Sequence, residues 1–130
     1  MRLLLDTHVW LWLTNSPEKL SRHAKRHLLA ERNERVLSAI SALEISIKYG
    51  LGKLPLPEPP SLYVPRLLSV TRTYPMAMQH SHALRLAELP FHHSDPFDRV
   101  IIAQAQIEGI PIVTADRQFE AYDVKIVWAN

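Results

Sequence analysis

The sequence predicts an α/β fold in which helices flank a parallel β-sheet. Short, uninterrupted apolar runs, typical of strands buried on both faces, alternate along the chain with longer segments of helical periodicity. The stretch from His92 to Asp116 combines a helix start, a helix stop and a following strand, with acidic residues at both ends. Because strands alternating with helices form right-handed crossovers, the carboxyl ends of the strands should share one edge of the sheet.

Length and composition favour one globular domain over residues 1–130. With 130 residues, of which 47% are hydrophobic, the chain can bury a core without disulfides. It has no cysteine, so metal ligands would be oxygen atoms or imidazoles, and the composition suits a reducing cytoplasm. The apolar amino-terminal segment is interrupted by Asp6 and His8 and is too short to span a membrane. We therefore expect a cytoplasmic protein, and the net charge of +2 permits a polyanionic partner without requiring one.

The first predicted strand is the leucine triplet at residues 3–5, which leads directly to Asp6. Residues 7–14 follow as a short apolar helix that covers the sheet. Trp10 and Trp12 lie in this helix. We favour core packing for them because tryptophan is largely buried in folded proteins, and a protein interface is the alternative.

The next predicted helix starts at Ser16-Pro17 or at Ser21 and runs to about Glu31, and its polar face belongs to the most basic segment of the chain. Arg22, Lys25 and Arg26 lie on this face. A solvated surface is the favoured interpretation, and contact with phosphates is the alternative.

The second strand is predicted at residues 36–40, with Ser41 as the N-cap of the helix that follows. Ser41 and Glu44 have the spacing of a capping box, in which the Glu44 carboxylate reaches back to the backbone N–H of Ser41. Glu44 thus has a complete structural explanation, although it would also lie at the carboxyl end of a strand. Gly50 and Gly52 should end the helix.

The middle of the chain is rich in proline. Residues 55–65 are predicted to form a connector that is neither a helix nor a central strand. A short helix is expected at residues 62–68, an edge strand at 74–78, where Pro75 disfavours a central position, and another helix at 81–89. The last strand is expected at residues 124–128.

The helix that follows His93 has clear start and stop signals. Asp95 stands at the N-cap, Pro96 at the first helical position, and Asp98 two residues later, while Gly109 ends the helix. The unpaired N–H groups at a helix start favour an acid there without any further role, so Asp95 fits a purely structural interpretation. A short strand then leads to Asp116.

Four acids map to the carboxyl edge of the predicted sheet or to the helix starts above it: Asp6, Glu44, Asp98 and Asp116. Two carboxylates about 4 Å apart repel by roughly 4 kcal/mol at an effective dielectric constant of about 20, so such a group needs a positive charge within it. Mg²⁺ or Mn²⁺ prefers oxygen ligands and binds substrate phosphates as well. The chemistry favoured by this arrangement is phosphodiester hydrolysis.

Other phosphate chemistries lack their characteristic residues. The three glycines, Gly50, Gly52 and Gly109, form no phosphate-binding loop. A phosphatase that uses an aspartyl phosphate would need a second aspartate two residues after the first, and the chain has His8 at that position. These differences leave a metal-dependent nuclease as the favoured enzyme class.

Four segments of the chain resemble the PIN-domain ribonucleases, specifically the VapC-type toxins of toxin–antitoxin pairs: LLLDTHVWLW, SALEISIKYGLGKL, HHSDPFDRVIIAQA and IVTAD. The resemblance implies a three-layer α/β fold with a parallel sheet of order 3-2-1-4-5, and a site for Mg²⁺ or Mn²⁺. It also implies site roles for the four acids Asp6, Glu44, Asp98 and Asp116 as catalytic metal ligands, for Asp95 as an additional candidate ligand, and for Thr7 and Thr114 as side chains that support the ligands.

The function expected from these features is hydrolysis of RNA by metal-activated water, without a protein nucleophile. The alternative is a non-catalytic PIN-like module that binds RNA or protein and whose acids are helix caps. For RNA contacts we expect the basic residues Arg22, Lys25, Arg26 and Arg99. Buried or capping roles are at least as well supported for His92 and His93 as phosphate contact, so they are not placed among the catalytic residues.

Two partner proteins are expected besides RNA. Aromatic and apolar residues near the helix starts exceed what a small sheet needs for its core, which favours a homodimer and a bound partner chain. The residues concerned are Trp10, Trp12, Tyr49, Leu51, Leu54, Leu56 and the proline-rich run. The family resemblance implies that the partner is a cognate antitoxin, which would inhibit the acidic site by covering it or by inserting a cation.

Overall fold

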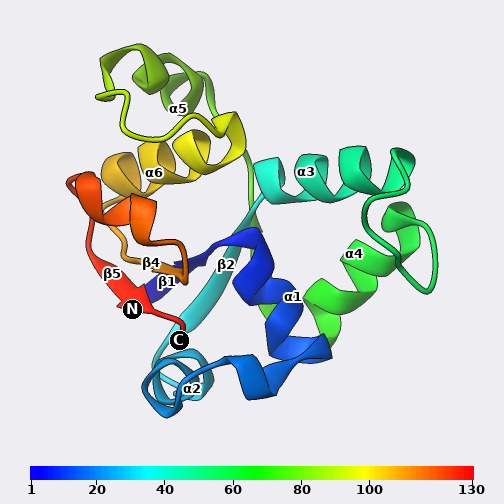
Figure 1. Cartoon of the computed structure of the whole chain (residues 1–130). Helices are drawn as coiled ribbons and strands as arrows, with labels where there is room; N and C mark the ends of the chain where they lie inside the picture. Colours follow the sequence, from blue (N-terminus) through cyan, green and yellow to red (C-terminus); the bar gives the residue numbers. More distant parts are fainter.

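The computed structural model describes residues 1–130 and contains one five-stranded parallel sheet (Figure 1). The strand order is β3-β2-β1-β4-β5, which confirms the predicted α/β fold and sheet order. The strands are β1 (Arg2–Leu5), β2 (Glu34–Ser38), β3 (Thr73–Met76), β4 (Ile112–Thr114) and β5 (Ile126–Trp128). Thus β1 lies at the centre of the sheet, and β3, with Pro75, lies at an edge as predicted.

Six α-helices and three short 3₁₀ helices connect the strands. The α-helices are α1 (Thr7–Asn15), α2 (Arg22–Leu29), α3 (Ala39–Gly50), α4 (Pro60–Val70), α5 (His80–Arg85) and α6 (Pro96–Glu108). The 3₁₀ helices cover Pro17–Lys19, Leu86–Glu88 and Arg117–Ala121. None of the helices combines the length and apolar character needed to cross a membrane.

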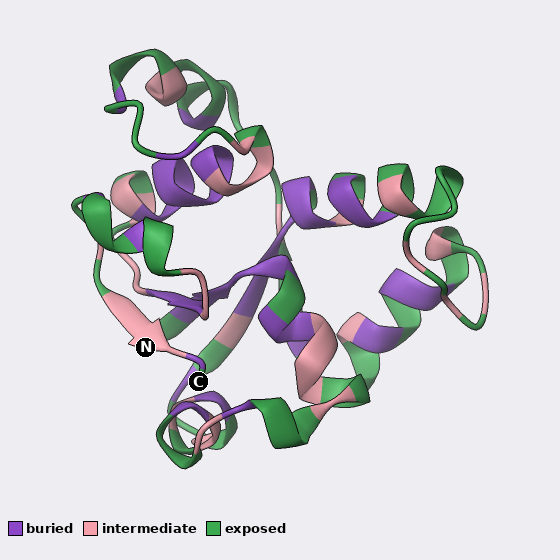
Figure 2. Ribbon diagram, in the orientation of Figure 1, coloured by how far each residue is buried: buried purple, intermediate pink, exposed green.

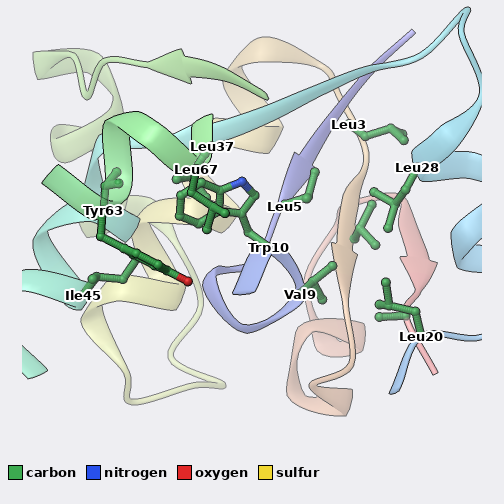
Figure 3. Packing of buried hydrophobic residues seen from close by; sticks show 13 residues of the cluster. Leu3, Leu5, Val9, Trp10, Leu20, Leu28, Leu37, Ile45, Tyr63 and Leu67 are labelled. Carbon is green, nitrogen blue, oxygen red and sulfur yellow. The ribbon is translucent and has the colours of Figure 1, made fainter. Parts of the chain in front are cut away.

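The core consists of two apolar clusters, one on each face of the sheet. Leu3 and Leu5 of β1 pack into the first cluster with residues of α1 and α4, whereas Leu4 packs into the second cluster with α6. Because successive side chains of a strand point to opposite faces, the leucine triplet supplies both clusters. Figure 3 shows the first cluster around Trp10, and in Figure 2 buried residues line the sheet and the helix faces turned toward it.

Trp10 supports the core interpretation of the first helix. Its side chain is fully buried, and its indole Nε1–H donates to the Thr73 hydroxyl at 3.2 Å. Trp12 is partly buried and packs against the same cluster. The two tryptophans are therefore largely used within the chain.

The start of α3 differs from the sequence prediction. The strand β2 ends at Ser38, and the Ser38 hydroxyl caps α3 by accepting from the Ile40 N–H at 3.1 Å. Ser41 lies inside the helix, fully buried, where its hydroxyl accepts from the Thr7 hydroxyl at 2.8 Å. The predicted capping box is therefore wrong, and Glu44 has no capping role.

The proline-rich segment also differs from the prediction, because α4 begins at Pro60 and continues through Pro65. Pro60 occupies the first helical turn, where a missing N–H costs nothing. Pro65 lies inside the helix on an exposed face, as does Ser61 one turn earlier, so water can hydrate the carbonyl that lacks its helical donor. A helix is therefore compatible with both prolines.

Candidate metal centre

The four predicted acids come from four different elements. Asp6 lies between β1 and α1, and Glu44 lies in the second turn of α3. Asp98 lies in the first turn of α6, and Asp116 lies just after β4. Figure 1 shows the starts of α1, α3 and α6 close to one another above the centre of the sheet.

Asp6 is buried beside the central strand and is only partly satisfied by hydrogen bonds. Its Oδ2 accepts from the Thr114 hydroxyl at 2.8 Å, but its buried Oδ1 has no hydrogen-bond partner. Burial raises the pKa of Asp6, the Thr114 hydrogen bond opposes this rise, and the charges of Glu44 and Asp116 add to it. Asp6 also stands at the N-cap position of α1, yet its side chain makes no capping bond.

Glu44 has the same combination of burial and a free oxygen atom. Its Oε2 lies 2.6 Å from the Lys48 ammonium one turn later, and its buried Oε1 has no partner. The hydrogen bond to Glu44 raises the pKa of Lys48, and the charges of Asp95 and Asp98 raise it further. Lys48 is therefore a cation that the chain itself provides at the edge of the acidic group.

The pKa of Asp98 responds to burial and to the charges of the other acids. Burial raises its pKa to about 8, and the charges of Asp6, Asp95, Glu44 and Asp116 contribute to this rise. The fold thus brings the four predicted acids into one electrostatically coupled group. A carboxyl with so high a pKa gains little from ionising unless a cation compensates the repulsion.

His93 joins two of these acids, a role that was not predicted from the sequence. The buried imidazole places Nε2 at 2.9 Å from Asp98 Oδ2 and at 3.1 Å from Asp116 Oδ2. One ligand atom from each of the three residues lies within 4.8 Å of the others, a spacing that could hold a metal ion. His92 next to it is exposed, and no sequence signal distinguishes the two histidines.

Asp95 is the N-cap of α6, as predicted. Its Oδ1 accepts from the backbone N–H groups of Phe97 at 2.9 Å and Asp98 at 3.4 Å. It still contributes to the raised pKa of Asp98, so its charge acts on the site. A role for Asp95 as a metal ligand remains a prediction.

The two predicted supporting threonines have different partners. Thr114 donates to Asp6 and accepts from the Asp116 N–H at 3.1 Å, so one buried hydroxyl connects two of the acids. Thr7 donates to Ser41 and contacts no carboxylate through this bond. Thr7 therefore joins α1 to α3, and Thr114 orients the acids themselves.

The basic face of α2 lies apart from the acids. Arg22 and Arg26 are exposed and Lys25 is half-buried, and Figure 1 places α2 well away from the starts of α3 and α6. This position agrees with a solvated face. The three cations do not lie at the acidic group, contrary to the expectation that they guide RNA toward it.

Arg99 differs from its predicted role because its guanidinium is bound within the fold. Its Nη1 donates to the Pro90 carbonyl at 3.0 Å and to the Tyr122 hydroxyl at 3.2 Å, and its Nη2 donates to the Leu86 carbonyl at 3.0 Å. The group also lies over the Phe91 ring, 4.8 Å from its centre. Arg99 thus holds the segment before α6 in place. Its role in the fold is structural, in place of the expected contact with RNA.

The donor set fits a hard divalent cation. Two buried carboxylate oxygens, on Asp6 and Glu44, lack partners, and an isolated buried anion is strongly unfavourable. Oxygen-rich sites with several carboxylates suit Mg²⁺ and Mn²⁺. The acids can therefore bind a cation between them, and the chain provides no cysteine for a softer metal.

Comparison with known proteins identifies the family. A sequence model described as the PIN domain matches residues 3–125, which is nearly the whole chain. The chain belongs to the PIN domain family. The predicted family resemblance is confirmed.

Two curated relatives of this PIN domain come from Mycobacterium tuberculosis and are both named ribonucleases. Ribonuclease VapC22 is 30% identical over 121 residues, which cover 92% of this chain and 91% of the relative. Ribonuclease VapC16 is 51% identical over 51 residues, which cover 39% of this chain and 36% of the relative.

Solved structures of toxin–antitoxin proteins share the PIN domain fold. VapBC2 from Rickettsia felis, bound to a DNA fragment from its promoter, has a TM-score of 0.76 at 20% identity, and the match covers 100% of both chains. DNA-bound VapBC from Salmonella typhimurium has a TM-score of 0.72 at 23% identity, and the match covers 98% of both chains. These matches show the same fold.

Proposed function

We propose that this PIN domain is a metal-dependent endoribonuclease and the toxin of a toxin–antitoxin pair. The observation that carries the proposal is the buried acidic group in which Asp6 and Glu44 each keep one oxygen without a partner and the pKa of Asp98 is raised to about 8. The ribonuclease names of the curated relatives support RNA as the substrate. The four acids and the lack of a cysteine nucleophile favour hydrolysis by water over a covalent intermediate.

In this proposal Asp6, Glu44, Asp98 and Asp116 hold Mg²⁺ or Mn²⁺, with Asp95 as an additional candidate ligand. When bound, the ion supplies an activated water molecule and offsets negative charge at the scissile phosphate. Thr114 fixes the direction of the Asp6 carboxylate and holds the Asp116 backbone beside it. Asp98 would hold the ion as a carboxylate, because a cation would offset the burial and the neighbouring charges that raise its pKa.

RNA would approach a site that is strongly acidic before the ion binds. Lys48 is the partly exposed cation at the acidic group, and its ammonium offsets one of the charges there. The basic face of α2, formed by Arg22, Lys25 and Arg26, would contact only RNA that extends well beyond the scissile phosphate. We therefore expect these three residues to affect the binding of long RNA more than the cleavage of short RNA.

The test is cleavage of a labelled single-stranded RNA by protein stripped of metal with a chelator. We expect no cleavage after stripping and recovery of cleavage when Mg²⁺ or Mn²⁺ is added, because the four acids need a cation to act on the phosphate. A stripped preparation that still cuts RNA at the full rate in excess chelator would contradict the proposal.

The proposed protein partners are a cognate antitoxin and a second copy of the chain. The solved structures of similar fold include a toxin–antitoxin complex and a member of the VapBC family of toxin–antitoxin systems, which supports an antitoxin. Tyr49 and Leu51 are exposed at the end of α3, and Leu43, Ile47 and Leu62 add exposed apolar surface on α3 and α4. Of the other residues expected at an interface, Leu54 and Leu56 pack against the first core cluster. We place the toxin and its antitoxin in the cytoplasm.

Co-expression with the neighbouring reading frame tests the partner proposal. We expect the isolated chain to elute as a dimer in light scattering and the co-expressed chain to elute with a small partner that suppresses RNA cleavage, since exposed apolar surface favours association. A monomer that gains no partner, and whose expression leaves growth unchanged, would contradict it.

A non-catalytic binding module remains the second candidate function because two of the acids do cap helices. Asp95 caps α6, and Asp116 Oδ1 accepts from the Gln118 N–H at 2.9 Å at the start of a 3₁₀ helix. Asp6 and Glu44 make no such bonds, and each leaves a buried oxygen without a partner. Capping therefore explains two of the five acids, Asp95 and Asp116, and leaves Asp6, Glu44 and Asp98 unexplained.

A further inference from the structure

The His93 imidazole is held from both sides. Its Nε2 lies between Asp98 Oδ2, at 2.9 Å, and Asp116 Oδ2, at 3.1 Å. Its Nδ1 accepts a hydrogen bond from the backbone N–H of Asp95, with a nitrogen–nitrogen distance of 3.2 Å. The ring thus connects the start of α6 with the segment that follows β4.

Contacts with Phe119 and Tyr122 fix the place of the ring. The His93 backbone N–H donates to the Tyr122 hydroxyl at 2.9 Å. The ring meets Phe119 edge to face, with 6.0 Å between the ring centres. His93 is 6% exposed, so a rotation of the ring away from the acids would have to open this packing.

The Asp95 N–H determines which ring nitrogen carries hydrogen. A backbone N–H can only donate, so His93 Nδ1 must accept and must lack a hydrogen. The neutral ring then carries its hydrogen on Nε2, where it faces the two carboxylates. An Nε2 that binds a metal ion would have to move this hydrogen to Nδ1, where it would oppose the Asp95 N–H.

We propose that His93 is a positioning residue whose Nε2–H donates to Asp116 and lies against Asp98, so that the ring holds these two carboxylates at the metal centre, and that His93 is not itself a metal ligand. This inference rests on the proposed function, because it assigns the two acids to a metal centre. The proposal assigns a role to the second histidine of the HHSDPFDR segment, His93. The Asp95 N–H, at the start of α6, fixes the ring, and the ring fixes the two acids.

The neighbouring His92 provides the matched control. Its side chain is exposed, and its ring meets Tyr122 edge to face, 5.3 Å between centres, instead of meeting an acid. A substitution at His92 changes the local histidine content without removing the hydrogen bond to Asp116 or the contact with Asp98. It therefore separates a general effect on the segment from the loss of the Nε2–H donor.

The first test measures Mn²⁺ affinity by electron paramagnetic resonance, which does not depend on cleavage. We expect His93→Leu to weaken Mn²⁺ binding about 10–100-fold, the usual cost of losing a group that orients a metal ligand. His93→Gln retains an N–H donor near the position of Nε2 and should recover most of the affinity, and His92→Leu should bind as the unchanged protein does. Mn²⁺ affinity that is equal in His93→Leu and the unchanged protein would overturn the proposal.

The second test uses nitrogen-15 NMR of the unsubstituted protein, so it does not depend on how the variants fold. We expect the His93 ring to carry hydrogen on Nε2 and none on Nδ1, both without metal and with Mg²⁺. Hydrogen on Nδ1 with a bare Nε2 after Mg²⁺ addition would make His93 a ligand and overturn the proposal. Metal-dependent RNA cleavage by the same preparation separately tests the proposed function.

Discussion

Replacement of Asp98 by asparagine should reduce metal-dependent RNA cleavage by about 10²–10³-fold, the usual scale for losing a group that stabilises transition-state charge. An amide has nearly the same shape as the carboxyl but cannot ionise, so the site loses a charged ligand and keeps its packing. Asp6→Asn should have an effect of the same size, because Asp6 is the buried acid next to the central strand. The measurement is the rate of cleavage of a labelled RNA at saturating Mg²⁺.

Asp95→Asn tests whether Asp95 acts on the metal centre beyond its role as the N-cap. Asparagine caps helices as well as aspartate does, so α6 should keep its start while the site loses one nearby charge. We expect this variant to retain most of its activity if Asp95 only caps the helix. Cleavage by Asp6→Asn or Asp98→Asn at the unchanged rate, with the metal requirement intact, would remove that residue from the metal centre.

The metal-free protein should lose stability as the pH rises from about 4 to about 8. The pKa of Asp98 is raised from its ordinary value of 3.8 to about 8 in the folded state, so the folded state keeps a proton that the unfolded chain releases. Where the folded state binds more protons, the free energy of unfolding falls as the pH rises. The loss in the free energy of unfolding is therefore absent below about pH 4 and complete above about pH 8. The raised pKa of Asp6 acts in the same direction.

Asp98→Asn isolates this effect because an amide does not titrate. In excess chelator at pH 8, we expect the variant to be more stable than the unchanged protein by on the order of 2 kcal/mol, and the difference should vanish near pH 4. Urea unfolding at several pH values measures it. Added Mg²⁺ should reverse the order, because an ion at about 100 times its dissociation constant stabilises by roughly 2.7 kcal/mol and binds the unchanged protein better. A stability difference that is constant with pH would contradict the raised pKa of Asp98.

These two predictions concern acids that sequence reasoning located well. Asp6 and Asp116 each follow a strand, and Asp98 follows a helix start with an N-cap and a proline. Strand ends and helix starts are local signals, so the sequence places such residues at one edge of a parallel sheet. The order of the five strands came from the family resemblance, because apolar runs alone do not tell which strands are neighbours.

The predictions from sequence were wrong where tertiary contacts decide between similar local patterns. Ser38 and Ser41 are both serines before an apolar helix, and only the pairing of β2 with β3 through Ser38 makes Ser38 the cap. Arg99 follows Asp98 in the sequence but turns toward Pro90 and Tyr122, which lie in other segments. The helical periodicity of the sequence does not show that Arg99 binds Pro90 and Tyr122.

His93 differs from His92 for the same kind of reason. The two residues are neighbours of the same type, and both backbone N–H groups donate to the Tyr122 hydroxyl, at 2.9 and 3.0 Å. The His93 ring lies against Asp98 and Asp116 and is held by the Asp95 N–H, whereas the His92 side chain is exposed. A sequence motif can therefore contain a site residue without showing which of two histidines it is.

The most direct test of the metal centre is a calorimetric titration of metal-stripped protein with Mn²⁺. We predict binding to the unchanged chain and no measurable binding to a variant in which Asp6 and Asp98 become Asn, Glu44 becomes Gln and Asp116 becomes Asn, provided that circular dichroism shows this variant folded. The reason is that the four carboxylates are the source of the charge that attracts the ion. Equal heats of binding for the two proteins would contradict the claim that these four acids form the metal centre.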